Sequence, residues 1–445
     1  MDEFSIKAIS PIDGRYYNKC SKLNDYFSEY GLIRYRLKVE IDYFMELCKV
    51  LPELKNVKFK KSELTDIYTN FDPLEIKKIE RTTNHDVKAI EYYIRNRFKL
   101  INNPHTNFIH FALTSQDINN TALPLSISEA MSALILPNIT NIITSLKTLS
   151  EKWNHIPLLS QTHGQPASPT KLGKEMMVFV ERLEIQLESL SNTKLYAKFG
   201  GAVGNFNAHH IAYPEIDWSK FADKFINNYG LNRSKYTTQI DHYDSLSGLF
   251  DNLKRINTIL IDLSRDMWMY ISKEVFKLKI IKGEVGSSTM PHKVNPINFE
   301  NAESNLMLAN TLLEFFSRKL PISRLQRDLT DSSVCRNIGV SFGHCLISYS
   351  SLLTGLEKIE VNKPKIELDL QNNWVVVAEG IVSILKKNNY PEPYETLKKF
   401  TRNNNNITKE NISAFIDSLY ITPDVELELR QITPFNYTGI VYSST

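Results

Sequence analysis

Glycine is scarce in this chain of 445 residues, which contains only 16. That is about half of the usual share of roughly 7%. A glycine-rich nucleotide-binding fold or an all-β protein with many turns would need more glycine, so the composition disfavours both. The four cysteines form no CxxC pair and are too few for a disulfide framework. Their scarcity fits a protein of a reducing compartment.

Other absences bear on partners and location. No run of about 18 apolar residues is expected to span a membrane, and the longest stretch, Val375 to Leu385, is interrupted by Glu379. The charged residues Asp2 and Lys7 lie near the start without an apolar segment after them, so we expect no signal peptide. The net charge of +3 gives no electrostatic reason for binding nucleic acid or a membrane surface. We therefore expect a cytoplasmic protein with neither partner.

The strongest positive signal is the apolar periodicity of long helices. In four segments apolar residues recur at alternating intervals of four and three, which places them on one helix face. The four stripes run from Leu172 to Leu190, Leu246 to Ile271, Ala302 to Phe316 and Val334 to Leu356. A fifth helix is expected over Ser126 to Ser150, with a kink at Pro137. Helices that far exceed the mean of about 11–12 residues predict a long bundle or coiled coil.

Some apolar residues lie off these stripes, among them Ile185, Ile259 and Ile261. A helix that is apolar on more than one face needs more than one neighbour. We therefore expect the long helices to pack against other copies of the chain as well, in a homo-oligomer. The alternative is a monomer with a large core.

The sequence divides into three predicted regions. Residues 1–110 form an N-terminal helical domain, in which Leu32 to Leu51 is a clear helix that stops near Pro52. Residues 111–358 contain the long-helix bundle. The sequence Asn362-Lys363-Pro364 sets off a C-terminal helical domain of residues 359–445. The predicted fold class is mainly α, with three domains and a central bundle of long helices.

Polar side chains concentrate in four short segments. Residues 286–296 (GSSTMPHKVNP) lack apolar periodicity, and their prolines and small residues predict an ordered or gating loop. The other three loops are predicted at Thr82 to Asp86, Thr114 to Asp117 and Thr162 to Thr170. Each alone could be an ordinary surface loop, and Ser115 or Asp117 could simply cap a helix. Four such loops on a helical frame predict a composite site.

The segment 286–296 resembles the signature loop of the fumarase/aspartase superfamily, whose members eliminate fumarate from a C–N or C–O bonded succinyl group. The residues that match at fixed spacing are Gly286, Ser287, Ser288, Met290, Pro291, Lys293, Asn295 and Pro296. Further blocks resemble the bacterial-type branch that cleaves adenylosuccinate. They are residues 10–16 (SPIDGRY), 80–88 (ERTTNHDVK), 163–167 (HGQPA), 236–240 (YTTQI), 326–332 (QRDLTDS) and 373–374 (NW).

The resemblance implies a three-domain helical fold and a homotetramer in which three subunits contribute to each active site. It also implies β-elimination of fumarate from adenylosuccinate, which gives AMP, and a parallel cleavage of succinylaminoimidazole carboxamide ribotide in purine biosynthesis. The proton that is removed lies next to a carboxylate and is weakly acidic. The enzyme therefore needs a base, groups that stabilise the carbanion, and an acid for the leaving nitrogen.

By the same resemblance, Ser287 is the general base and acts as its alkoxide, which the N–H groups of the loop and the cation of Lys293 would stabilise. His163 is the general acid at the leaving nitrogen, because an imidazole titrates near neutral pH. Glu300 matches the acidic residue that orients this histidine. The alternative is that Glu300 is an ordinary glutamate at a helix N-terminus, where the helix dipole favours it.

The substrate carries two carboxylates and a phosphate, so its site needs cations and hydrogen-bond donors. The resemblance assigns one set to the nucleotide end: Arg15, Tyr16, His85, Asp86, Arg327, Ser332 and Arg336. It assigns a second set to the succinyl carboxylates: Thr114, Ser115, Gln239, Ser288, Lys293 and Asn295, with Asn301 close by. Asn84, beside His85, is a further predicted substrate ligand. Neither a metal nor another cofactor is expected, since hydrogen bonds and cations stabilise the carbanion and no HxxxH or HxH spacing occurs.

Two alternatives stay open. One is a sibling lyase that acts on another succinyl substrate, such as argininosuccinate. The pair Arg15-Tyr16 and the block from Thr82 to Asp86, which would serve a phosphate, disfavour it. The other is a structural relative without activity, which the joint presence of Ser287, His163 and Lys293 disfavours.

Overall fold

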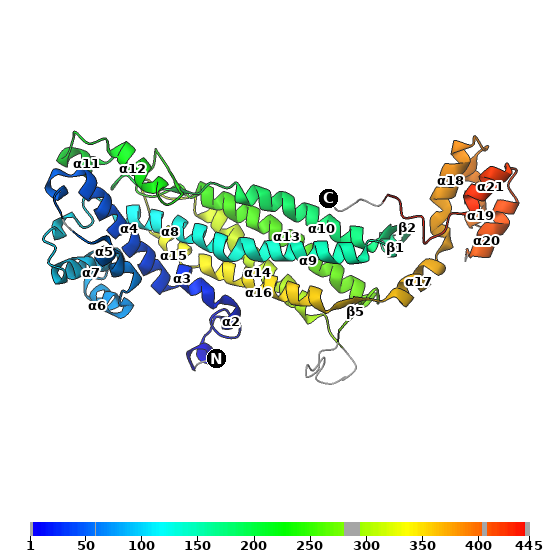
Figure 1. Cartoon of the computed structure of the whole chain (residues 1–445), viewed down its shortest axis with the longest axis horizontal. Helices are drawn as coiled ribbons and strands as arrows, with labels where there is room; N and C mark the ends of the chain where they lie inside the picture. Colours follow the sequence, from blue (N-terminus) through cyan, green and yellow to red (C-terminus); the bar gives the residue numbers. More distant parts are fainter. Residues whose placement is uncertain (1–2, 58, 280–293, 403–406, 441–445) are drawn as a thin grey trace. The chain divides into compact units, whose positions relative to one another are not determined.

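The computed structural model describes residues 3–57, 59–279, 294–402 and 407–440, and it confirms the mainly α-helical fold class (Figure 1). The chain divides into two compact units, each built from three segments. Unit 1 consists of Met1–Thr140, Ile185–Ile261 and Ala302–Ser350. Unit 2 consists of Asn141–Glu184, Asp262–Asn301 and Ser351–Thr445. Each boundary between these segments falls inside a long helix.

The long helices are confirmed where the apolar stripes predicted them, except that the stripe from Val334 to Leu356 is interrupted after Val334, which belongs to a separate short helix that ends at Cys335. They are α9 (Leu136–Trp153), α10 (Leu172–Ser191), α13 (Asp244–Ser272), α14 (Ile297–Lys319) and α16 (Ile338–Lys358). The longest of these, α13, has 29 residues, and its stripe from Leu246 to Met267 is at most 3% exposed. Of the residues off the stripes, Ile259 is buried within the chain, whereas Ile185 is 57% exposed. Burial in this chain therefore accounts for only part of the extra apolar surface.

The helix expected from Ser126 begins earlier than predicted. α8 (Ser115–Ala130), a π-helical turn (Met131–Ile135) and α9 follow one another without a break. The first turns of α8 carry polar residues that are buried, which hides the apolar pattern from the sequence. Pro137 has no N–H for the helix ladder, and the wider π turn directly precedes it.

The continuous segment Ser115–Trp153 has the length and hydropathy of a membrane span, with a mean hydropathy of 1.3 in its most apolar window. More than half of that window, 56%, is buried within the protein. This burial is what the core helix of a folded domain requires, so the segment's composition alone does not indicate a membrane helix.

In unit 1, the helix α4 (Glu29–Val50) contacts α3, α5, α7 and α8. The smaller helices are α1 (Glu3–Lys7), α2 (Tyr17–Cys20), α3 (Asn24–Phe27), α5 (Lys61–Thr69), α6 (Pro73–Thr83), α7 (Asp86–Leu100), α11 (Asn207–Ala212), α12 (Trp218–Asn227) and α15 (Thr330–Cys335). The Ser28 hydroxyl caps α4 by accepting the Gly31 N–H at 3.1 Å, and the helix stops before Pro52 as predicted. β3 (Tyr196–Ala197) and β4 (Asn232–Arg233) form a short parallel pair.

Unit 2 contains two antiparallel strand pairs and the C-terminal helices. β1 (Pro157–Thr162) pairs with β2 (Gln165–Lys171), and β5 (Phe276–Leu278) pairs with β6 (Ile359–Val361). The helices after β6 are α17 (Lys363–Gln371), α18 (Ala378–Lys387), α19 (Pro393–Arg402), α20 (Lys409–Asp417) and α21 (Pro423–Arg430). The prediction of a polar loop over Thr162 to Thr170 is wrong, because most of it is strand β2. Its polar side chains are mostly exposed, so no apolar alternation marks the strand.

Candidate active site

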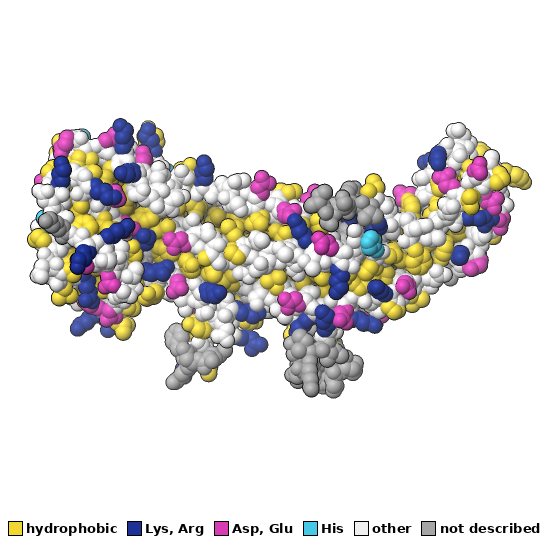
Figure 2. Space-filling model, viewed as in Figure 1, with side chains coloured by type: hydrophobic (Ala, Val, Ile, Leu, Met, Phe, Trp, Pro, Cys, Tyr) yellow, Lys and Arg dark blue, Asp and Glu magenta, His cyan; other side chains and the backbone are white. Residues whose placement is uncertain are grey.

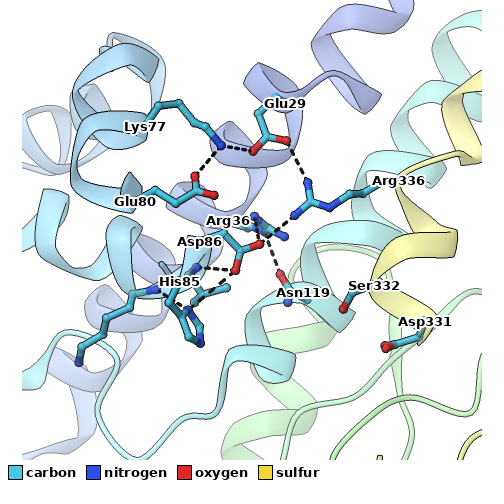
Figure 3. A network of polar contacts seen from close by, with 12 residues as sticks. Glu29, Arg36, Lys77, Glu80, His85, Asp86, Asn119, Asp331, Ser332 and Arg336 are labelled. Carbon is cyan, nitrogen blue, oxygen red and sulfur yellow. Dashed lines mark hydrogen bonds and ion pairs between the residues drawn. The ribbon is translucent and has the colours of Figure 1, made fainter. Parts of the chain in front are cut away.

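An ion-pair network in unit 1 joins segments that are far apart in the sequence (Figure 3). The Asp86 carboxylate at the start of α7 meets Arg36 of α4 and Arg336, which follows α15. Asp86 Oδ2 lies 3.0 Å from Arg36 Nη1 and 3.0 Å from Arg336 Nη2. Glu29 Oε2 lies 2.9 Å from the other terminal nitrogen of Arg336. The structure thus brings together Asp86 and Arg336, both predicted to bind the nucleotide end.

The turn that presents Asp86 follows from local backbone preferences. α6 ends at Thr83, and Asn84 then adopts the left-handed conformation (φ 49°), which asparagine tolerates better than most residues. His85 is the N-cap of α7, and its Nδ1 accepts the Lys88 N–H at 3.2 Å. Asp86 occupies the first turn of α7, where the helix dipole favours a carboxylate. The three predicted ligands of this block therefore share one tight turn.

The cations around Asp86 keep it ionised. Burial alone would raise the pKa of Asp86, but the Arg36 guanidinium, the Val87 N–H and Arg336 outweigh burial and lower that pKa. Burial lowers the pKa of Arg36 against the opposing effect of Asp86, and an arginine remains protonated at neutral pH. At pH 7 the network therefore holds one carboxylate between two guanidinium groups.

A small pocket adjoins the network. Its polar lining residues are Arg36, Gln116, Asn119, Asn120, Tyr243, Asp331, Ser332 and Arg336. At its edge Arg327 Nη2 donates to Ser332 Oγ at 2.9 Å. The Gln116 amide faces the Arg327 guanidinium, and with its oxygen turned toward the arginine it accepts from Nη1 at 3.1 Å and from Nη2 at 2.6 Å. Three of the residues predicted for the nucleotide end, Arg327, Ser332 and Arg336, thus lie at or beside one pocket that is rich in hydrogen-bond donors.

A fully buried ion pair holds the start of α8. Asp117 Oδ2 accepts the Thr114 N–H at 2.8 Å, so the N-cap of α8 is Thr114, and Asp117 is the N3 partner in its capping box. Neither Ser115 nor Asp117, the caps expected from sequence, is the N-cap itself. Asp117 Oδ1 accepts from Lys198 Nζ at 2.7 Å and from the N–H groups of Gly200 and Gly201 at 2.8 and 3.0 Å. Both charged side chains are 0% exposed. Burial lowers the pKa of Lys198 although Asp117 opposes this effect, so the lysine depends on its partner.

A second buried pair holds the segment before α8. His110 Nδ1 lies 2.5 Å from Oε1 of Glu40, a carboxylate of α4 that is 0% exposed. Burial alone would lower the pKa of His110, but the Glu40 carboxylate outweighs it and raises that pKa. α4 thus uses two buried charges, Arg36 and Glu40, to hold the start of α7 and the segment before α8, both of which lie next to predicted ligands.

The other predicted ligands of unit 1 are less enclosed. Arg15 is exposed, and its guanidinium carbon lies 5.9 Å from the centre of the Tyr16 ring. Ser115 is the first residue of α8 and is half-buried. The Gln239 N–H donates to the Gln326 carbonyl at 3.3 Å, which brings Gln239 next to the segment of Arg327. Arg15 and Tyr16 do not line the described pocket.

His163 lies in unit 2, at the tip of the β1–β2 hairpin. Thr162 pairs with Gln165, so His163 and Gly164 form a two-residue turn. Both have positive φ, 53° and 73°, as a type I′ hairpin turn requires. Histidine is among the residues that enter this conformation more often than average. His163 is exposed, and its side chain has no hydrogen-bond partner among the described residues.

The predicted residues around α14 also belong to unit 2. Glu300 is exposed, and its Oε1 accepts the Trp268 indole N–H at 3.1 Å. Asn301 Nδ2 donates to Ser351 Oγ at 2.8 Å, and Asn295 lies just before the helix. The predicted residues Ser287, Ser288 and Lys293 lie outside the described residues. Within the described ranges, no three His, Cys, Asp or Glu side chains are arranged to hold a metal ion.

Sequence reasoning missed Arg36 and Glu29, which contact the predicted ligands Asp86 and Arg336, and it missed Asn119, which contacts Arg36. One signal was available for Arg36. It lies on the face of α4 that also carries Ile33 and Leu37, all of them buried, and a charge within an apolar stripe needs a partner. The sequence alone does not name that partner, since Asp86 is distant along the chain.

Comparisons with known proteins agree with the motifs. Residues 14–310 match the family described as "Lyase", and residues 323–438 match "Adenylosuccinate lyase C-terminal". The adenylosuccinate lyase of Dictyostelium discoideum is 53% identical to this chain, covering 98% of this chain and 97% of its own length. That of Vibrio cholerae is 46% identical, covering 100% and 99%. That of Escherichia coli K12 is 45% identical, covering 99% and 98%.

Solved structures support the fold. The chain is similar to 3-carboxy-cis,cis-muconate lactonizing enzyme from Pseudomonas putida, with a TM-score of 0.73, 19% identity and 94% of each chain covered. It is also similar to β-carboxy-cis,cis-muconate cycloisomerase from Acinetobacter calcoaceticus, with a TM-score of 0.70, 15% identity, and 94% and 95% covered. At these identities the likeness concerns architecture alone.

Proposed function

The chain belongs to the adenylosuccinate lyase family, and we propose that it cleaves adenylosuccinate to AMP and fumarate. A carbon–nitrogen lyase of this kind also releases fumarate from succinylaminoimidazole carboxamide ribotide in purine biosynthesis. The observation that carries the proposal is the 53% identity to a named adenylosuccinate lyase over 98% of the chain. The pocket bounded by Arg36, Ser332 and Arg336 supports an anionic ligand such as a nucleotide phosphate.

In the proposed reaction, Ser287 removes the proton from the carbon next to the succinyl carboxylate. The electron pair moves into that carboxylate, and Lys293 and the neighbouring donors offset the charge. The C–N bond then breaks, and His163 gives a proton to the leaving nitrogen of the purine. The exposure of His163 supports this role, because an acid must reach the substrate. Glu300 would orient the histidine.

For binding, Arg15, Tyr16, His85, Asp86, Arg327, Ser332 and Arg336 would grip the nucleotide end, with Asn84 beside them. Thr114, Ser115, Gln239, Ser288 and Asn295 would hold the succinyl carboxylates, with Asn301 close by. With this division of the ligands, one set of residues would bind the phosphate and another set would bind the two carboxylates. Neither a metal nor another cofactor enters the proposed chemistry.

We further propose a homotetramer whose active sites are shared between copies. Apolar side chains that are 40–57% exposed on two long helices support such an interface: Val178 and Ile185 on α10, and Met307, Leu308 and Phe315 on α14. Figure 2 displays hydrophobic side chains at the surface over the long helices. Large exposed apolar patches generally mark interfaces. Sedimentation of the purified protein tests the assembly, and a monomer at micromolar concentration would exclude it.

The domain division at residues 110 and 358, and a cytoplasmic location, also stay proposals drawn from the sequence. The lack of a disulfide among the four free cysteines is compatible with a reducing compartment.

The proposed function is tested by an ultraviolet assay in which purified protein converts adenylosuccinate to AMP. The Ser287→Ala protein, prepared in parallel, is the control for contaminating activity. Conversion by the parent and not by the control is the expected result. Cleavage of argininosuccinate without cleavage of adenylosuccinate would instead identify a sibling lyase, and failure with every succinyl substrate would favour a structural relative.

A further inference from the structure

Arg36 is a buried arginine, 7% exposed, on the inner face of α4. A buried guanidinium is tolerated when it is paired with a carboxylate and its remaining donors find acceptors. Arg36 meets two partners in different helices. Its Nη1 lies 3.0 Å from Asp86 Oδ2 at the start of α7, and its Nε donates to Asn119 Oδ1 of α8 at 2.8 Å. One side chain therefore connects α4 with two substrate-binding segments.

The Asp86 carboxylate also contacts Arg336, so the position that Arg36 gives to Asp86 affects the orientation of Arg336. Both terminal nitrogens of Arg336 are engaged by carboxylates, Nη1 by Glu29 at 2.9 Å and Nη2 by Asp86 at 3.0 Å. Arg336 is still 42% exposed and lines the pocket together with Ser332. Its guanidinium is thus oriented before any ligand arrives. Such preorganisation lowers the entropy that binding would otherwise have to remove.

The charges in this network alternate in sign. From the buried end they run Arg36, Asp86, Arg336, Glu29, Lys77 and Glu80, as Figure 3 shows. Each residue between the two ends of the series has an opposite charge on both sides. Loss of Arg36 would therefore leave Asp86 with one cationic partner instead of two, and the change at Asp86 would then affect Arg336. Arg36 is the only end of this series that is buried, since Glu80 is partly exposed. The buried end supplies the fixed anchor.

Building on the proposed function, we propose that Arg36 is a positioning residue for the nucleotide end of the substrate. It fixes the Asp86 carboxylate and the Asn119 amide, and through Asp86 it sets the orientation of the Arg336 guanidinium at the phosphate. Arginine is needed because Nε and Nη1 contact two partners at once. The single ammonium group of a lysine has no such planar fork.

The test compares Arg36→Met and Arg36→Lys with the parent. AMP and fumarate are titrated by calorimetry, and adenylosuccinate cleavage gives KM and kcat separately. Arg36→Met should weaken AMP roughly 10- to 100-fold, since a misplaced ligand group commonly has effects of this size. KM should rise in parallel, while kcat and fumarate binding stay within about threefold. The AMP affinity of Arg36→Lys should lie between that of Arg36→Met and that of the parent.

Arg34→Met is the matched control. Arg34 lies on the same helix, donates to the Asp25 carbonyl at 2.9 Å and stacks over Tyr35, outside the network. The Arg34→Met substitution removes the same charge from the same helix, so this variant should bind AMP like the parent. If Arg34→Met and Arg36→Met lose AMP affinity to the same extent, the loss comes from the removed charge alone, and the proposal is overturned.

A double-mutant cycle separates positioning from a merely structural role. If Arg36 acts through Arg336, then Arg36→Met should weaken AMP by less than about threefold in an Arg336→Ala background. Full additivity would overturn the proposal. If Arg36→Met does not fold, Arg36→Lys decides the question, and parent-like AMP affinity in that variant would also overturn it. These failures differ from failure of the proposed function, in which the parent itself cleaves no adenylosuccinate.

Discussion

The predicted nucleotide ligands Asp86 and Arg336 of unit 1 and the proposed acid His163 of unit 2 differ in how their side chains are held. Asp86 and Arg336 lie in a network of ion pairs at about 3 Å, anchored by the buried Arg36. His163 stands at the exposed tip of a hairpin without a hydrogen-bond partner among the described residues. A binding group gains from being fixed in advance, because the ligand then does not have to order it.

The contrast indicates which parts of the proposed site are ordered within one chain and which are not. The predicted nucleotide ligands Asp86 and Arg336 find charged partners within one chain, so this part of the proposed site needs no second copy to be ordered. Among the residues that the structure describes, the proposed acid has no such partner, and a catalytic histidine needs a neighbour to orient it. We infer that another copy of the chain supplies that neighbour.

The largest effect is expected inside the frame of unit 1. Asp117→Asn removes the only carboxylate that pairs with the buried Lys198 among the described contacts. Breaking a buried pair generally lowers stability by about 3–5 kcal/mol, because one charge is left uncompensated. The urea midpoint should fall sharply. Asp217→Asn, an exposed N-cap of α12, is the matched control and should change it little. Similar midpoints for both variants would refute the framing role of Asp117.

At the hairpin tip the opposite behaviour is expected. His163→Ala should lower kcat by ~10²-fold or more, about 2.7 kcal/mol, which is the usual contribution of a positioned acid. Its unfolding midpoint should match the parent, since an exposed side chain without partners stabilises little. Ser287→Ala should lose turnover to a similar extent. His210→Ala, which removes another exposed histidine, is the control. Near-normal turnover in His163→Ala would remove it from the mechanism.

A smaller effect is expected at Arg15, an exposed member of the predicted nucleotide set. Arg15→Ala removes a charge-assisted contact of ~1.5–3 kcal/mol, or roughly 10- to 150-fold in AMP affinity. Fumarate has no phosphate, so its binding should change far less. Lys22→Ala, the loss of another exposed cation in the same region, serves as control. If calorimetry gives equal AMP affinities for the Arg15 variant and the parent, Arg15 lies outside the site.

The smallest effect concerns pH. The pKa of His110 is raised in the folded protein by Glu40, so the folded state binds this proton more tightly than the unfolded state. The pair therefore stabilises fully below the unfolded pKa of about 6.5, and this contribution is lost as pH rises through the folded pKa. The Tm difference between parent and His110→Asn, at most about 2–4 °C, should shrink from pH 6 to pH 9. A difference that grows with pH would contradict the sign.

The helices and the membership of the site could be predicted from the sequence to different degrees. Apolar periodicity is a local property, so the buried stripe of α13 can be predicted from the sequence. The β1–β2 hairpin was not, because its residues around His163 are polar and exposed. Motif resemblance led to Asp86 and Arg336, but the contacts of both with Arg36 or Glu29 depend on tertiary packing. Such pairings between distant segments leave no trace in spacing or composition.

The central claim is that the proposed acid works in a site completed by another copy of the chain. The most direct measurement mixes inactive Ser287→Ala with inactive His163→Ala under conditions that exchange subunits, and assays adenylosuccinate cleavage. Native mass spectrometry of the mixture confirms that hybrids have formed. Partial activity should return, because some hybrid sites then receive both residues from unmutated copies. If hybrids form and no activity returns, Ser287 and His163 come from one chain and the account of a shared site is contradicted.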